Sequence, residues 1–112
     1  KKQLSENSWT LSLRDRLLTG PIEGQKLRLT NREKVLLVSL SHAKEHILES
    51  GALCDLFSRE DDEEGMTKHA LEELIARLRK KFKTVQEADA EPAIKSVWGV
   101  GYQLCVPISL VY

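Results

Sequence analysis

A run of cationic side chains in the second half of this 112-residue sequence has the composition of a surface that binds phosphate groups. Arg77, Arg79, Lys80, Lys81 and Lys83 fall within seven positions. Arginine can donate two parallel hydrogen bonds to guanine O6 and N7, and both arginine and lysine neutralise backbone phosphates. The first hypothesis for this chain is therefore that it binds nucleic acid.

The cationic run lies on a segment with the spacing of an amphipathic helix. Leucine, isoleucine and phenylalanine recur at intervals of three and four over residues 71–82, which is typical of a buried helix face. Thr67 suits the N-cap, and the lysines of the last turns suit the negative end of the helix dipole. With the apolar stripe inward, the outward face carries His69, Glu73, Ala76 and Lys80, with Arg77 beside them.

This outward face offers groups to base edges, and its flanks offer cations to phosphates. Arg77 can bind guanine, Ala76 can contact the methyl group of thymine, and Glu73 can accept from cytosine N4. The remaining cations lie towards the sides of the helix, where phosphates would be. The candidate DNA contacts on this segment are Lys68, His69, Glu73, Ala76, Arg77, Arg79, Lys80, Lys81 and Lys83.

A β-hairpin is predicted after this helix, over residues 94–106. Gly99 and Gly101 supply the positive-φ freedom that a tight connection needs. Lys95 and Ser96 lead into its tip and can hold phosphates. Trp98 lies near the tip, where it contacts DNA or covers the edge of the core, and Tyr102 is expected in the core with Trp9.

The residues N-terminal to the cationic helix predict the strands and helices that must position it. Alternating residues over 9–13 predict a strand, and 16–19 and 25–29 predict two more, which together form a small antiparallel sheet. Thr30 and Glu33 match a capping box, which predicts a helix that begins there and ends near His46. A second, shorter helix holds Leu53, Leu56 and Phe57, and the acidic run 60–64 interrupts it as a loop.

This order of elements and three motifs resemble the OmpR/PhoB-type effector domain of bacterial transcription regulators. Residues 29–33 match its L-T strand end followed by Glu, residues 75–81 match I-x-R-L-R-K-K/R, and residues 94–102 match I-x-T-V-x-G-x-G-Y with Ser96 in place of Thr. The resemblance implies an α+β winged helix-turn-helix: an N-terminal antiparallel sheet, three helices and a C-terminal hairpin wing. It also implies that the third helix enters the major groove of promoter DNA and that the wing touches the adjacent groove or backbone.

The resemblance further implies how the domain is used. The regulator would be longer than this chain, with residues 1–112 as its C-terminal output module. The length of the chain separately predicts that these residues form a single domain, and its two cysteines, in no metal-ligand spacing, favour a reducing, cytoplasmic compartment. The partners of the output module would be double-stranded DNA, a second copy on repeated half-sites, and an upstream receiver or sensor domain. No small-molecule substrate and no cofactor are expected.

Three departures from the family pattern keep a second hypothesis open. Glu73 stands where a small apolar residue is common, Ala76 stands where a basic residue is common, and the run 60–64 is wholly acidic. The formal net charge of the chain is zero. The alternative function is therefore a protein-interaction module that kept the winged-helix scaffold but lost DNA binding.

Enzymatic chemistry has little support in the sequence. Residues 42–46 match the H-x-x-E-H pattern of inverted zinc peptidases, but no second motif supplies a distant acidic ligand and the chain is short for such an enzyme. No Ser/His/Asp set, phosphate-binding glycine loop or Cys-x-x-Cys pair is present. We therefore predict neither catalysis nor a metal site.

Overall fold

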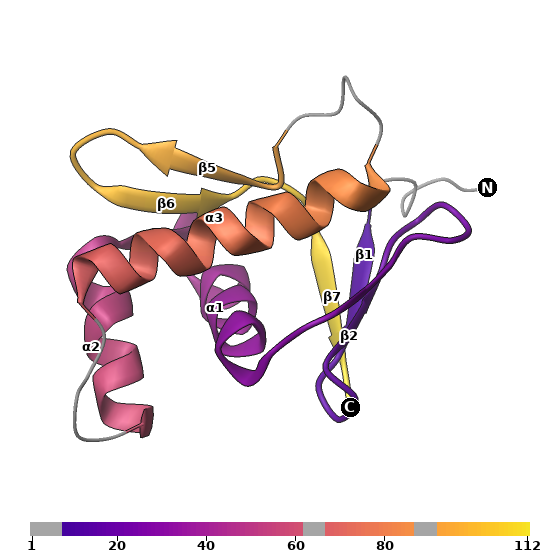
Figure 1. The fold of residues 1–112 in the computed structure, drawn as a ribbon, viewed down its shortest axis with the longest axis horizontal. Coiled ribbons are helices and arrows are strands. Elements are labelled where there is room, and N and C mark those ends of the chain that lie inside the picture. The colour runs from indigo at the N-terminus through magenta and orange to yellow at the C-terminus, as the bar shows by residue number, and fades with distance from the viewer. Residues whose placement is uncertain (1–7, 62–66, 87–91) are drawn as a thin grey trace.

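The computed structural model describes residues 8–61, 67–86 and 92–112, except for the side chains of 57–61 (Figure 1). These parts contain an N-terminal sheet, three α-helices and a C-terminal hairpin, so the predicted winged-helix architecture is confirmed. The helices are α1 (Asn31–His42), α2 (Ser50–Asp61) and α3 (Lys68–Val85). The strands are β1 (Trp9–Ser12), β2 (Leu17–Thr19), β3 (Lys26–Arg28), β4 (Ile47–Glu49), β5 (Ile94–Val97), β6 (Gly101–Leu104) and β7 (Ile108–Val111).

The N-terminal sheet is mixed, where the sequence predicted a purely antiparallel one. Its strand order is β3-β2-β1-β7, and β7 runs parallel to β1. The pairing sets Trp9 opposite Ile108 and Leu11 opposite Leu110. The C-terminal segment was not predicted to be a strand, because only the tertiary fold returns it to the beginning of the chain. Figure 1 shows β7 beside β1.

The first helix begins as predicted and ends earlier. Thr30 Oγ1 accepts from the Glu33 amide at 3.2 Å, and Glu33 Oε1 accepts from the Thr30 amide at 2.9 Å, which confirms the capping box. The helix stops at His42, because Ala43 is extended and the next residues form a 3₁₀ turn, Lys44–His46. Glu45 and His46 have positive φ angles of 56° and 59°, so the expected continuation to His46 is wrong.

The second helix is longer than predicted. It spans 12 residues, the same number as α1. Its backbone includes Glu60 and Asp61, so the start of the acidic run is helical instead of a loop. The rest of that run, residues 62–64, lies outside the described residues. Leu53, which the sequence placed on the buried face, is fully buried.

A second sheet supports the wing. Its order is β4-β6-β5, and both pairings are antiparallel. The hairpin β5–β6 was predicted, but β4, a three-residue strand between α1 and α2, was not. The wing is thus backed by a third strand that joins it to the helices.

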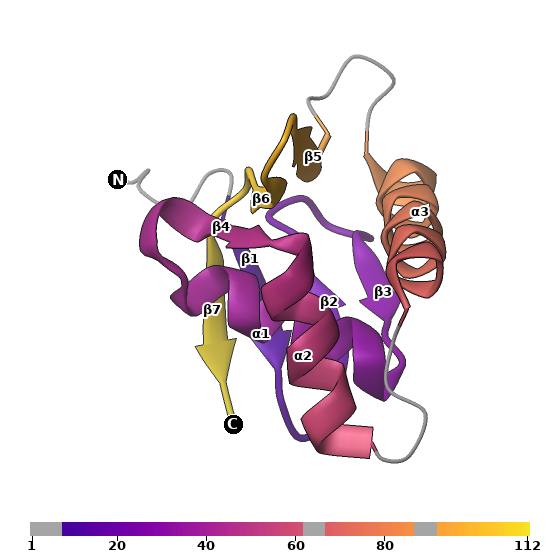
Figure 2. The same ribbon diagram turned by 90° about the vertical axis from the view of Figure 1, so that its left-hand side faces the viewer.

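One hydrophobic cluster joins both sheets to the three helices. The stripe predicted on α3 is buried in full: Leu71, Leu74, Ile75, Leu78 and Phe82 are each at most 4% exposed. Trp9 packs edge-to-face on Phe82 with ring centroids 5.1 Å apart, which confirms its predicted place in the core. Figure 2 shows α3 at the margin of the molecule, with β3, α1 and α2 to one side of it and β5 above.

Candidate nucleic-acid interface

The outward face of α3 is open to solvent. Thr67 Oγ1 accepts from the Ala70 amide at 3.0 Å and fixes the start of the helix. The side chains that the sequence assigned to this face are all exposed: His69, Glu73, Ala76, Lys80 and the adjacent Arg77. Lys68 and Lys83, which were predicted as further DNA contacts of the helix, are exposed as well. The buried stripe on the opposite side sets this orientation, so the face is available to a partner.

Glu73 does not stand alone in the middle of that face. His69 Nε2 lies 3.3 Å from Glu73 Oε2, one helical turn away, with the two side chains 80% and 60% exposed. The contact is an ion pair only when the imidazole is protonated. At this exposure water screens it, so the Glu73 carboxylate remains open to a donor from outside.

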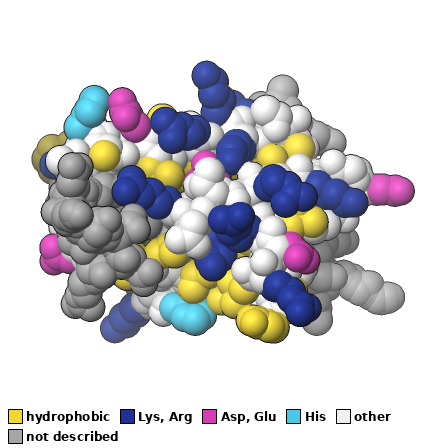
Figure 3. Space-filling view, turned by 60° about the horizontal axis from the view of Figure 1, so that its bottom comes forward, with side chains coloured by type: hydrophobic (Ala, Val, Ile, Leu, Met, Phe, Trp, Pro, Cys, Tyr) yellow, Lys and Arg dark blue, Asp and Glu magenta, His cyan; other side chains and the backbone are white. Residues whose placement is uncertain are grey.

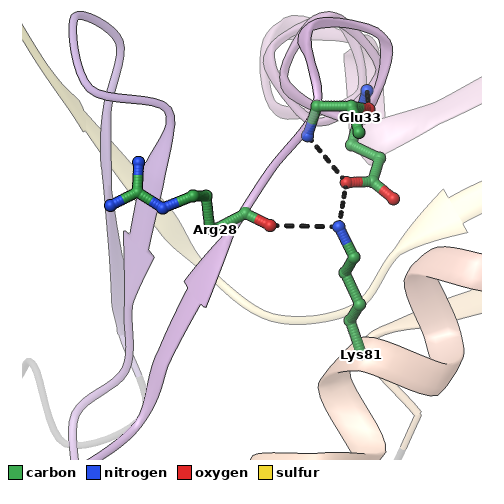
Figure 4. Close-up of polar contacts among 4 residues, drawn as sticks. Arg28, Glu33 and Lys81 are labelled. Atoms are coloured by element: carbon green, nitrogen blue, oxygen red, sulfur yellow. Dashed lines mark hydrogen bonds and ion pairs between the residues drawn. The ribbon is translucent and has the colours of Figure 1, made fainter.

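Lys81 does not lie free on the flank of α3, as expected for a phosphate contact. Its Nζ donates to Glu33 Oε1 at 2.6 Å and to the Arg28 carbonyl at 3.0 Å (Figure 4). The Glu33 side chain is fully buried, and the same Oε1 receives the Thr30 amide. Lys81 therefore joins α3 to β3 and to the first turn of α1.

Arg79 connects the helix to the wing. Its Nε donates to the Ile94 carbonyl at 2.9 Å, and its Nη2 donates to Ser96 Oγ at 3.0 Å. The sequence assigned both Arg79 and Ser96 to phosphates, whereas here they bond to each other. Arg79 thus holds β5 against α3 and fixes how far apart the two elements lie.

Trp98 projects from the tip of the wing. The turn between β5 and β6 is closed by the Val100 amide donating to the Val97 carbonyl at 2.9 Å, with Gly99 at φ 78°. Trp98 is 96% exposed. The alternative in which it covers the edge of the core is therefore wrong. Lys95 is also exposed on the wing.

Tyr102, expected in the core, is only half-buried against it. Burial raises the pKa of its phenol, and the nearby Glu72 carboxylate raises it further, while Arg79 acts in the opposite sense. The phenol is therefore neutral in the physiological range. It adds no charge at the junction between α3 and the wing.

Cations outside α3 widen the basic surface. Lys26, Arg28 and Arg32 are exposed on β3 and at the start of α1, the elements that the Lys81 bridge holds against α3. Figure 3 shows many Lys and Arg side chains over one face, with isolated Asp and Glu among them. Sequence reasoning missed these three residues because only the tertiary contact brings them near the run on α3.

The family described as transcriptional regulatory protein, C terminal, matches residues 24–104. This is the OmpR/PhoB-type DNA-binding domain. The chain belongs to this family. The match spans β3 through β6 and so includes α3, the wing and the helices that hold them. An OmpR/PhoB-type domain is a DNA-binding domain of transcription regulators and not an enzyme.

Solved structures share the fold of this OmpR/PhoB-type domain. The DNA-binding domain of E. coli CadC is 25% identical with a TM-score of 0.74, over 91% of this chain and 90% of that one. The C-terminal domain of NsrR, a lantibiotic response regulator for nisin resistance, is 24% identical with a TM-score of 0.69, over 92% and 96%. A C128D mutant of RitR is 24% identical with a TM-score of 0.61, over 80% of this chain and 36% of that one. No curated protein matches the sequence.

The H-x-x-E-H segment lacks the geometry that zinc ligation would need. Two histidines bind one metal when they face the same side of one helix. Here His42 ends α1, and His46 follows a backbone break with positive φ, where its Nδ1 lies 3.3 Å from the Leu40 carbonyl. Within the described ranges, no group of three or more His, Cys, Asp and Glu side chains could hold a metal ion.

Over the described residues, none of the helices combines the length and the apolar character of a membrane span.

Proposed function

We propose that this OmpR/PhoB-type domain binds a specific duplex sequence with α3 in the major groove and the β5–β6 wing on the adjacent minor groove or backbone. The observation that carries the proposal is the outward face of α3, which is exposed along its length and rich in cations. A helix of this diameter fits the major groove, where each base pair presents a distinct set of donors and acceptors.

The contacts of the structure separate the exposed candidate residues from those already bonded inside the protein, and the exposed ones are proposed to contact DNA. Arg77 and Lys80 lie on the outward face and are proposed to read bases, with Ala76 and Glu73 beside them. Lys68, Lys83 and Lys95 are exposed cations that are proposed to contact phosphates.

The remaining candidate residues form bonds within the protein. Arg79, Ser96 and Lys81 are already engaged by protein partners. We assign them to holding α3 and the wing in place for DNA.

The proposal extends to how the domain is controlled. NsrR is a response regulator, and this chain covers only 36% of the RitR chain. By analogy, the domain is the output module of a longer cytoplasmic regulator with an upstream receiver or sensor domain. Two copies on repeated half-sites would double the base contacts of one.

A selection experiment tests the proposed function. The protein is used to enrich duplexes from a randomised pool, and binding of the enriched duplex is compared with a scrambled one by fluorescence anisotropy over a range of salt. We expect enrichment of one motif and an affinity that falls as salt rises, because phosphate contacts release counterions. A pool that stays random after repeated rounds contradicts sequence-specific binding.

The protein-interaction module remains the second candidate. Glu73 favours it, because an exposed carboxylate in the middle of the α3 face repels phosphates unless a base donor reaches it. Under that hypothesis the protein binds neither the enriched nor the scrambled duplex at low salt.

A further inference from the structure

The tip of the wing exposes apolar side chains, and the proposed base contacts of α3 give them no role. Trp98 is 96% exposed, and Val100 beside it is 42% exposed. A tryptophan side chain can bury about 150–250 Å² against a partner. Single exposed hydrophobic residues are common on proteins, so the surroundings of Trp98 must decide what it does.

The wing holds the Trp98 backbone on a rigid support. The Ser50 amide donates to the Val100 carbonyl at 3.2 Å, so the start of α2 braces the turn. At Gly101 a Cβ atom would collide with the backbone of Leu48 and Glu49, which shows how closely β6 lies on β4. Little backbone entropy remains to be lost when the indole meets a partner.

The position of the tip is fixed relative to the helix proposed for the major groove. Arg79 bonds β5 to α3 through the Ile94 carbonyl and Ser96 Oγ. Figure 1 shows the hairpin lying along α3, with its turn near the N-terminal end of that helix. A duplex seated on α3 therefore has the wing tip beside it.

The wing has little charge with which to hold DNA. Between residues 94 and 104, Lys95 is the only charged residue. A wing that relied on phosphates alone would gain one contact. Its largest available free energy comes instead from burying or stacking the indole.

We propose that Trp98 is an apolar wedge that enters the minor groove next to the α3 site and stacks partly into one base step, bending the duplex. This inference rests on the proposed function. Proteins that insert apolar side chains from the minor groove unstack a step and bend DNA by roughly 20–90°. Pyrimidine–purine steps unstack most easily, so the wedge gives the domain a preference at base pairs that it does not hydrogen-bond.

The experiment uses the duplex enriched by the selection above, labelled with a donor and an acceptor dye at its two ends. Binding should raise the transfer efficiency between the dyes, because the bend shortens the distance between the two ends of the duplex. It should also quench the fluorescence emission of Trp98 and protect that emission from quenching by acrylamide. Trp9 is 3% exposed in the core and serves as the constant emitter. Trp98→Ala should weaken binding about tenfold and remove the bend, without changing the salt dependence.

A matched control is the exposed aromatic residue that directly follows β7. Tyr112 is 85% exposed, and Tyr112→Ala should bind as the parent does. Trp98→Arg should restore part of the affinity and steepen the salt slope by about one phosphate contact. Replacing pyrimidine–purine steps in the flank by an A-tract should weaken the parent but not Trp98→Ala.

Two results distinguish a failure of the proposed function from a failure of the wedge alone. If no duplex is enriched, the proposed function fails and the wedge fails with it. If the parent binds an enriched duplex but Trp98 emission and the dye distance stay unchanged, the wedge alone is overturned. An equal response to stiff and flexible flanking steps, or a flatter salt slope in Trp98→Ala, overturns it as well.

Discussion

At the scale of single residues, two lysines of the same helix have different surroundings. Lys83 is exposed, whereas Lys81 donates to the buried Glu33 carboxylate and the Arg28 carbonyl. Side chains two positions apart on a helix, such as those of Lys81 and Lys83, point in directions about 200° apart. This rotation turns one ammonium to solvent and the other towards α1, although both belong to one cationic run.

Arg77→Ala should weaken binding to the enriched duplex by about 1–3 kcal/mol and relax the preference at one base pair, because a bidentate contact to guanine is lost.

Lys83→Ala should weaken binding to all sequences alike and flatten the salt dependence of binding, because one phosphate contact is lost. Anisotropy titrations with point variants of the duplex measure both effects. An unchanged affinity for the Arg77 variant would place that residue outside the base contacts.

Lys81→Ala should act on stability before it acts on DNA. Removing the ammonium leaves the fully buried Glu33 carboxylate without its ion-pair partner. Since Lys81 is itself 31% exposed, we expect the free energy of unfolding to fall by about 2–3 kcal/mol, which is near the lower end of the range for breaking a buried ion pair. Urea denaturation measures this change. The Glu33→Gln, Lys81→Met double variant should recover part of it.

For Lys81 the salt dependence of DNA binding is the decisive second readout. A folded Lys81 variant should keep the slope of the parent, in contrast to Lys83→Ala. A flatter slope would show that Lys81 contacts phosphate after all.

At the scale of elements, α3 is held from two sides by its own cations. Lys81 joins it to β3 and α1, and Arg79 joins it to the wing. Gln25, buried at the turn before β3, also donates through Nε2 to the Val85 carbonyl at the end of α3 at 3.0 Å. The helix that would enter the groove is therefore fixed in position by side chains as well as by its apolar stripe.

Arg79→Ala should loosen the wing from α3 without unfolding the protein. The two hydrogen bonds to β5 disappear, so the amides of β5 and β6 should exchange with deuterium faster while those of α1 remain protected. Ser96→Ala removes one of the two bonds and should give a smaller change. Equal protection in Arg79→Ala and the parent would show that β4 alone fixes the wing.

At the scale of the whole molecule, the first and last strands in sequence, β1 and β7, pair within the N-terminal sheet. The Trp9 amide donates to the Pro107 carbonyl and the Leu13 amide to the Val111 carbonyl, each at 2.8 Å. Ile108 and Leu110 pack partly buried against the core. The strand that follows the wing thus completes the sheet whose Trp9 packs against Phe82 of α3.

Deleting residues 108–112 should therefore lower the unfolding free energy on the order of 2–4 kcal/mol, through lost apolar burial and lost ladder hydrogen bonds. Urea denaturation followed by circular dichroism measures this change. Deleting Tyr112 alone should cost less than about 1 kcal/mol, because its ring is exposed and meets Arg14 in a weak cation–π contact at 5.8 Å. Similar losses for both deletions would mean that β7 contributes little.

Local patterns were enough to identify α3 and the wing. Three- and four-residue spacing reports which side of a helix is buried, and Gly99 reports a tight turn, because each depends on neighbours in sequence. The capping box at Thr30 was found for the same reason. Gly101 was predicted to supply positive φ as well, but it lies in β6 without a positive φ and is needed instead because a Cβ there would collide with the backbone of β4. The outward orientation of Arg77 and Lys80 followed from the stripe alone.

The sequence by itself thus determined the family, the order of the main elements and which residues of α3 face outward. The tertiary structure alone decided that Lys81 and Arg79 act as internal ties, that β4 and β7 exist as strands, and that Trp98 stands free at the wing tip. The reason is physical: a lysine or a short strand has no local preference that fixes its partner. That choice is made when residues as far apart as Glu33 and Lys81, or Trp9 and Ile108, are brought together by the burial of a common core.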